Sequence, residues 1–207
     1  MIPLFHDMNG KKVVIFGGGE VGFRKASFFY PEADVSVVSR TFAKDFNRIN
    51  VTLIKKDLNE ADDSYLNEII KGSMIVVAAT SDRDLNDKIG ILAKNAGAFF
   101  NNADGKAKDV IIPSVVSGKN FLIAVSTCGK SPAMSRYIRK NIEENLPNPD
   151  EMIALQNEVR ELLKEKVPVQ KDRNEILQNI IYDEKVWEKL KEGHYFAFNY
   201  VREKYLQ

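Results

Sequence analysis

A glycine-rich turn between an apolar run and a helical pattern constrains the fold of this chain more than any other sequence feature. Residues 13–16 are apolar, and Gly17, Gly19 and Gly22 follow in the spacing G-x-G-x-x-G. The first glycine of this pattern permits a tight turn, the second lets the backbone approach a pyrophosphate, and the third lets the helix pack closely on the strand. Unpaired amides and the positive end of the helix dipole favour an anion there. The stretch therefore predicts a strand, an anion-binding turn and a helix.

Apolar, β-branched runs alternate with helical patterns over the first half of the chain. The run at 73–79 is almost continuously apolar, which is typical of a strand that helices cover on both faces. We therefore predict an α/β fold with a Rossmann-type parallel sheet. Thr80 follows the fourth strand, at the edge where the cofactor is expected. The expected strands are 12–16, 35–39, 51–55, 73–79 and 98–101, and the expected helices are 20–30, 64–71 and 84–95.

The pattern changes past residue 104. Residues 110–113 and 121–125 predict two strands of a hairpin outside the parallel core, and Ser131 and Pro132 are typical of the start of a helix, here one that reaches residue 145. From residue 150 the pattern is helical, with breaks near Pro168 and Gly193 and three or four segments. Residues 2–5 predict an apolar arm that packs on the first domain. We expect three parts: a dinucleotide-binding domain (1–112), a connecting segment (113–148) and a helical C-terminal domain (149–207).

Composition excludes several classes of protein. The 30 basic and 29 acidic residues leave a formal net charge of +1, so we expect neither a nucleic-acid nor a membrane partner. Cys128 is the single cysteine, and His6 and His194 lie far apart, so we expect no disulfide and no metal site. No apolar stretch approaches the roughly 20 residues that span a bilayer, and no leader pattern is present. These features predict a cytoplasmic protein.

The end of the second strand leaves the choice of dinucleotide open. Ser39, Arg40 and Thr41 stand where an acidic residue would bind the ribose 2′-hydroxyl group of NAD. Arg40 either meets the 2′-phosphate of NADP or lies exposed beside an adenosine that other groups hold. The residues predict a nicotinamide dinucleotide here and do not exclude NADP.

Asp104 follows the fifth strand, at the sheet edge where ligands of open α/β folds bind. Its carboxylate is either a general acid or base or a turn residue. From Asp104 to Lys140 the chain carries seven basic and two acidic residues, with Lys130 in a glycine-containing turn. This excess suits an anionic substrate, or is the solvated face of a helix.

These motifs together resemble the siroheme-synthase amino-terminal family, which comprises precorrin-2 dehydrogenases with or without sirohydrochlorin ferrochelatase activity. The resemblance covers about the first 145 residues. The chain departs from the family pattern at Gly22, where alanine is usual, and at Cys128, where glycine is usual. A positive φ at position 128 would be costly for cysteine. The residues that carry it are Pro3-Leu4-Phe5, Gly17 to Val21 with Arg24-Lys25, Val77 to Thr80 with Leu85-Asn86, Asn102-Ala103-Asp104, Pro113, Ser126-Thr127, Gly129 to Ala133, Arg139 and Glu143.

The resemblance implies NAD-dependent oxidation of precorrin-2 to sirohydrochlorin by a homodimer in which the segment 113–148 exchanges contacts between subunits. It implies that Asp104 is the catalytic aspartate and that Fe²⁺ enters only as a substrate, in members that also chelate. Two alternatives stay open: a bifunctional dehydrogenase and ferrochelatase, and a non-catalytic module that senses dinucleotides. The implied dinucleotide contacts include Glu20, Val21, Arg40 and Thr41, and the implied tetrapyrrole contacts are Ser126, Thr127 and Lys130.

Overall fold

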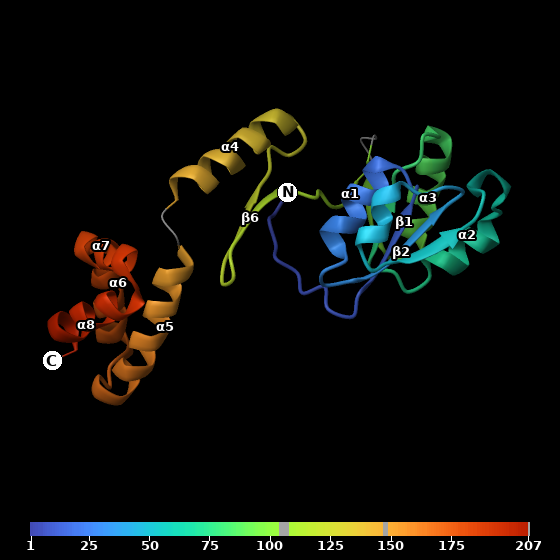
Figure 1. Cartoon of the computed structure of the whole chain (residues 1–207). Coiled ribbons are helices and arrows are strands. Elements are labelled where there is room, and N and C mark those ends of the chain that lie inside the picture. The colour runs from blue at the N-terminus through green and yellow to red at the C-terminus, as the bar shows by residue number, and fades with distance from the viewer. Residues whose placement is uncertain (104–107, 147–148, 207) are drawn as a thin grey trace. The chain divides into compact units, whose positions relative to one another are not determined.

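The computed structural model describes residues 1–103, 108–146 and 149–206. The chain divides into two compact units, Met1–Ile112 and Pro113–Gln207, which are described separately below (Figure 1).

The first unit is built on a five-stranded sheet of order β3-β2-β1-β4-β5, in which every neighbouring pair is parallel. The central strand β1 pairs with β2 on one side and β4 on the other, so Val14 lies between Ser36 and Val76. This order confirms the predicted α/β fold with a Rossmann-type sheet. The strands are β1 (Lys12–Phe16), β2 (Asp34–Ser39), β3 (Thr52–Lys55), β4 (Ile75–Ala78) and β5 (Phe99–Asn102).

Helices cover both faces of this sheet. Successive side chains of a strand point to opposite faces, so an apolar strand needs a packing partner on each face. Val14 and Phe16 pack with helices α2 (Asp63–Ile70) and α3 (Arg83–Asn95). Val13 and Ile15 pack on the other side with α1 (Glu20–Phe29) and the short 3₁₀ helix η1 (Lys44–Arg48). All four of these strand residues are fully buried. The burial on both faces explains why β1 and β4 are continuous apolar runs in the sequence.

The N-terminal arm differs from the expectation. Ile2, Leu4 and Phe5 are 80%, 84% and 71% exposed, so they do not pack on the sheet unit. The prediction of a packed arm is wrong, and these residues leave apolar surface uncovered on a single chain.

The hairpin lies later in the chain than predicted. Its strands are β6 (Ser114–Ser117) and β7 (Leu122–Val125), which pair antiparallel, so the prediction of a strand at 110–113 is wrong. Val110 and Ile112 instead pack against the core of the first unit, and the carbonyl of Val110 accepts a hydrogen bond from the Asn101 side chain at 2.8 Å. Pro113 has no backbone N–H to donate, which favours the start of pairing after it.

Helix α4 (Pro132–Asn145) begins as predicted. The Ser131 side chain accepts a hydrogen bond from the Met134 amide at 3.2 Å, and Pro132 occupies the first turn. Figure 1 shows α4 beside the β6–β7 hairpin. Of the described residues between 113 and 146, only Val116 and Ser135 are buried, so the hairpin and α4 lack a core of their own.

Four helices end the described chain and share one core. Its fully buried members include Leu155, Val159, Ile180 and Val201. The predicted breaks at Pro168 and Gly193 are confirmed, whereas the break at residue 183 was not predicted. None of the described helices is long and apolar enough to cross a bilayer. The four helices are α5 (Pro149–Lys166), α6 (Gln170–Tyr182), α7 (Glu184–Glu192) and α8 (His194–Tyr205).

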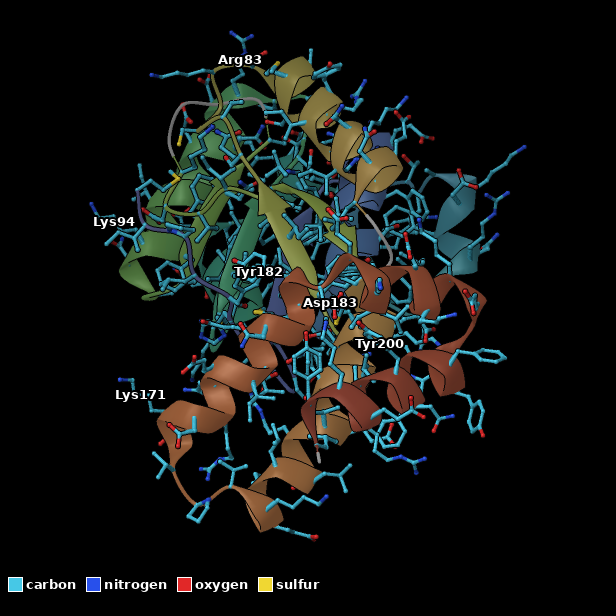
Figure 2. The ribbon with its side chains drawn as sticks, turned by 90° about the vertical axis from the view of Figure 1, so that its left-hand side faces the viewer. Arg83, Lys94, Lys171, Tyr182, Asp183 and Tyr200 are labelled. Atoms are coloured by element: carbon cyan, nitrogen blue, oxygen red, sulfur yellow. The ribbon has the colours of Figure 1, made fainter. Side chains whose placement is uncertain are left out.

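Asp183, between α6 and α7, ties these helices to α8 (Figure 2). One carboxylate oxygen accepts hydrogen bonds from Lys204 at 2.8 Å, Tyr205 at 3.0 Å and Tyr200 at 3.1 Å. The other caps α7 by accepting from the Lys185 amide at 3.0 Å. Burial alone would raise the pKa of Asp183, but these hydrogen bonds outweigh it and hold the pKa below its ordinary value.

We expect Asp183→Asn to destabilise the C-terminal helices by about 2 kcal/mol at neutral pH, because it removes a carboxylate that accepts charge-assisted hydrogen bonds. Since the folded pKa is lowered, this contribution is present above the ordinary carboxyl pKa of about 4 and is lost as the pH falls through the lowered pKa. Urea unfolding followed through Trp187, the single tryptophan and a residue of α7, measures the effect on this unit.

The neighbouring exposed carboxylate supplies the control, since Glu184→Gln removes the same charge and leaves the three hydrogen bonds from α8 to Asp183 in place. The cost of Asp183→Asn is smaller at about pH 3, below the ordinary carboxyl pKa, because this carboxylate is then largely protonated in the unfolded wild-type chain. An equal cost at both pH values, or an equal cost for Glu184→Gln, contradicts the role of this carboxylate.

Candidate dinucleotide site

Two glycines of the turn after β1 are required by the packing of the backbone. Gly17 has a φ of +118°, and its amide donates to the Val38 carbonyl at 2.9 Å. A Cβ atom at Gly17 would lie 2.3 Å from the Ala79 carbonyl oxygen, and one at Gly22 would lie 1.9 Å from the Gly17 carbonyl oxygen. Both distances are shorter than atoms tolerate, so these glycines hold β1, β4 and α1 close together.

Gly19 differs from both, because a Cβ atom there would meet nothing within 4 Å. It is the N-cap residue of α1, and no side chain caps the helix. The first amides of α1 therefore have no N-cap side chain as a partner, and they lie at the positive end of the helix dipole. Backbone that a ligand can approach closely, with amides to donate, fits a pyrophosphate group.

A cavity of about 460 Å³ opens at this turn. It lies at the carboxyl ends of β1 and β4, where the sheet order reverses direction, which is the ligand-binding position of open α/β sheets. The structure places eight of the predicted cofactor residues on its wall, while Gly22 lies behind the turn. Those eight are Gly17, Gly19, Glu20, Val21, Ser39, Arg40, Thr41 and Thr80. The other residues of the wall, which were not predicted as cofactor contacts, are Gly18, Asp57, Leu58, Asn59, Ala79, Ser81, Asp82 and Leu85.

Thr80 is fixed on this wall by Asn86, a residue of α3 that is 1% exposed. The Asn86 side-chain oxygen accepts from the Thr80 hydroxyl at 2.7 Å and from the Thr80 amide at 3.2 Å. Its side-chain nitrogen donates to the Thr80 carbonyl at 3.1 Å. A buried amide with these three bonds holds the loop after β4 in one conformation. The sequence offered Asn86 only as part of a resemblance, not as a positioning group.

The loop after β2 is tied to the glycine turn and to β3. The Ala43 amide donates to the Gly18 carbonyl at 2.7 Å, and this bond holds the segment of Arg40 and Thr41 at the cavity. The Arg40 guanidinium donates to the Asp57 carboxylate at 3.3 Å. The wall thus contains an acidic residue beside Arg40, and the segment after β3 supplies it, not β2.

Two residues of α1, Arg24 and Lys25, form a positive cluster with Lys108 in the same unit. Burial lowers the pKa of Lys25, and the nearby charges of Arg24 and Lys108 lower it further. Lys108 pairs with Asn101 in an isolated bridge beside β5. The three basic residues therefore stand close to one another and favour an anion in their surroundings.

Ser126, Thr127 and Lys130 lie together in the loop from β7 to α4, within the second unit. The Thr127 hydroxyl accepts from the Ser131 amide at 3.0 Å, and the Ser126 hydroxyl accepts from the Cys128 amide at 3.1 Å. Cys128 has a φ of +54°, which agrees with the strain expected of a non-glycine residue here. Asp104 lies outside the described residues.

A second cavity, of about 580 Å³, lies in the C-terminal unit around Asp183. Its central polar groups, Asp183, Tyr200, Lys204 and Tyr205, bond to one another, as described above. Their mutual bonding gives them a structural role. Among the described residues, no three histidine, cysteine or acidic side chains gather in a way that suits a metal ion.

Comparisons with known proteins agree with this geometry. The model of a family described as "Putative NAD(P)-binding" matches residues 4–114. The precorrin-2 dehydrogenase of Methanosarcina barkeri (strain Fusaro / DSM 804) is 40% identical over 198 residues, which cover 93% of this chain and 88% of that protein. The siroheme synthase of Stutzerimonas stutzeri (strain A1501) is 32% identical over 148 residues, 70% of this chain and 31% of that protein.

The solved structure of SirC, a precorrin-2 dehydrogenase, superposes with a TM-score of 0.75 at 21% identity and covers 98% of this chain and 100% of that one. This likeness extends the shared fold to the C-terminal helices, beyond the part in which the sequence motifs lie. With the alignment to the M. barkeri protein over almost its whole length, the predicted resemblance is confirmed: this chain belongs to the precorrin-2 dehydrogenase family.

Proposed function

We propose that this protein oxidises precorrin-2 to sirohydrochlorin, with NAD⁺ as the hydride acceptor. The observation that carries the proposal is the cavity at the glycine turn, which gathers eight of the nine predicted cofactor residues in a chain that aligns over 93% of its length with a precorrin-2 dehydrogenase. A dinucleotide-binding Rossmann unit alone supports many chemistries, so the family membership supplies the substrate.

Different residues of the cavity bind different parts of the dinucleotide. The amides of Gly19, Glu20 and Val21 bind the pyrophosphate at the start of α1, and the loop with Ser39, Arg40 and Thr41 holds the adenosine. Thr80, fixed by Asn86, lines the wall across the cleft. NAD⁺, when bound, supplies the acceptor for the hydride that precorrin-2 loses.

Loss of two hydrogens from precorrin-2 releases a proton along with the hydride. Asp104 is the group that we assign to take this proton, as a general base. Two features support the assignment: the resemblance, and the position of Asp104 in the sequence, two residues after Asn102. At Asn102 β5 ends, and the carboxyl ends of the parallel strands β1 and β4 border the cavity.

The tetrapyrrole carries several carboxylates, and these require positive charge and hydrogen-bond donors. We assign their binding to Ser126, Thr127 and Lys130, with the basic excess between residues 104 and 140 as support. The exposed thiol of Cys128 suits a reducing compartment, and we place the reaction in the cytoplasm.

Anaerobic incubation of precorrin-2 with NAD⁺ and the full chain tests the proposal. We expect NADH and sirohydrochlorin to form, and only slow product formation with NADP⁺. Addition of Fe²⁺ or Co²⁺ after oxidation tests for chelation and identifies a bifunctional enzyme if metal enters the ring. A folded protein that binds NAD⁺ and leaves precorrin-2 unchanged contradicts the proposal and favours a sensing module.

We also propose a homodimer built on the segment 113–148. A hairpin with one helix is marginal without a shared core, and the apolar side chains of α4 are uncovered, with Tyr137 63% and Met134 46% exposed. We expect light scattering to give twice the chain mass of 23.4 kDa. Tyr137→Lys weakens the dimer at least about tenfold, since a buried interfacial tyrosine contributes about 2 kcal/mol.

Tyr182→Lys is the matched control for this dimer, because Tyr182 is an equally prominent aromatic side chain, 84% exposed, on α6. We expect it to leave the dimer intact. A monomeric wild-type chain, or equal weakening by both substitutions, contradicts an interface on α4.

A further inference from the structure

The ribose end of the dinucleotide cavity holds a carboxylate that does not come from β2. Strands β2 and β3 are parallel neighbours, with Ser39 aligned opposite Lys55. Arg40 follows β2 directly, and Asp57 is the second residue after β3 ends. Because the carboxyl ends of parallel neighbours meet at one edge of the sheet, both side chains reach the same wall of the cavity.

The Asp57 carboxylate is the fixed member of this pair. One oxygen accepts from the Asn59 amide at 3.0 Å and caps the short 3₁₀ helix η2 (Leu58–Glu60), while the other accepts from Arg40 at 3.3 Å. The side chain of Asp57 is 27% exposed and that of Arg40 is 70% exposed. The guanidinium is therefore the member that can move, and the carboxylate holds it.

The charge of the cavity wall opposes an additional phosphate group. Among the described residues that line it, Glu20, Asp57 and Asp82 are acidic and Arg40 is the single basic residue. A 2′-phosphate group would have to compete with Asp57 for Arg40 and approach this acidic wall. A 2′-hydroxyl group, in contrast, can donate a hydrogen bond to a carboxylate.

We infer that Asp57 is the residue that selects NAD⁺ over NADP⁺, both as the acceptor for the 2′-hydroxyl group and as the counter-charge that withholds Arg40 from a 2′-phosphate. The inference rests on the proposed function in taking this cavity as the dinucleotide site. It assigns to the segment after β3 the role that an acidic residue at the end of β2 has in NAD-binding Rossmann folds. It also resolves the two alternatives for Arg40, which is neither a phosphate ligand nor a bystander.

Titration calorimetry of the full chain with NAD⁺ and NADP⁺ tests the inference without any turnover. We expect the wild type to bind NAD⁺ more tightly. In Asp57→Asn, the ratio of NADP⁺ affinity to NAD⁺ affinity rises about tenfold or more, since Arg40 becomes free for a charge-assisted bond to the 2′-phosphate. Asparagine caps helix starts as well as aspartate does, so the variant keeps its fold.

Two further variants test whether the change in affinity ratio comes from the Arg40–Asp57 pair. Glu60→Gln removes a carboxylate from the same 3₁₀ helix at an exposed position away from the cavity wall, and we expect it to leave the affinity ratio within about twofold of the wild type. Arg40→Ala combined with Asp57→Asn cancels the gain in NADP⁺ affinity, because the freed guanidinium is absent.

A wild type that prefers NADP⁺, or an unchanged ratio in Asp57→Asn, overturns the inference. A failure of the proposed reaction can be distinguished from a failure of this inference. A chain that binds NAD⁺, shifts its ratio as expected and still does not oxidise precorrin-2 contradicts the proposed function and supports the role of Asp57.

Discussion

Replacement of Gly19 by alanine is expected to lower the affinity for NAD⁺ about 100-fold, since the loss of two charge-assisted hydrogen bonds to a pyrophosphate costs about 3 kcal/mol. The added Cβ atom meets nothing in the protein within 4 Å, so the fold does not resist it. Gly19 lines the cavity, so the added methyl group takes up space at the wall to which the pyrophosphate is assigned. Calorimetric titration with NAD⁺ measures the loss, and urea unfolding followed by circular dichroism measures the stability, which we expect to be unchanged.

Gly17→Ala is the matched variant, and for it we expect a loss of stability, which Gly19→Ala does not cause. Its Cβ atom would lie 2.3 Å from the Ala79 carbonyl oxygen, at a φ of +118° that alanine rarely adopts. We expect it to destabilise the first unit by about 3 kcal/mol or more, as a forced backbone clash does. If Gly19→Ala binds NAD⁺ normally, the pyrophosphate does not approach this turn.

Asp104→Asn is expected to reduce the rate of NADH formation from precorrin-2 about 1,000-fold, which lies within the usual range for the loss of a general base. Asparagine has nearly the same shape and cannot accept the proton. We expect the affinity for NAD⁺ and the urea midpoint of the variant to match those of the wild type. Steady-state rates at saturating NAD⁺ and precorrin-2 measure the effect on turnover.

Asp84→Asn is the control for this substitution, because Asp84 is an exposed aspartate in the first turn of α3 and does not line the cavity. Its rate should equal that of the wild type. A normal rate for Asp104→Asn would remove Asp104 from the reaction. Loss of NAD⁺ affinity along with the rate would indicate a structural role for this carboxylate.

The sheet unit could be predicted from the sequence because its signals are local. The continuous apolar runs of β1 and β4 require burial on both faces, and the glycine turn fixes the direction of the chain after β1. The β6–β7 hairpin was misplaced because residues 110–112 are as apolar as a strand. Their burial against the first unit, through the bond from Asn101 to the Val110 carbonyl, depends on tertiary contacts that no local pattern contains.

The residues of the cavity likewise divide into those that local sequence signals predict and those that depend on tertiary contacts. The residues after β1, β2 and β4 could be placed at one edge from strand order alone, whereas Asp57 and Asn86 were missed. Asp57 follows β3, whose contribution to the ribose end depends on the side-by-side register of β2 and β3. Asn86 acts through a loop six residues away, and a helical asparagine carries no sign of that role in the sequence. The break at Asp183 likewise depends on contacts with α8, far along the chain.

The stoichiometry of the first turnover tests the central claim most directly. Excess wild-type protein is mixed anaerobically with NAD⁺ and a limiting, measured amount of precorrin-2, and NADH and sirohydrochlorin are quantified together. We predict one NADH for each sirohydrochlorin formed, in amounts that equal the precorrin-2 supplied. Precorrin-2 recovered unchanged from a folded protein that binds NAD⁺, or sirohydrochlorin formed without NADH, would contradict it.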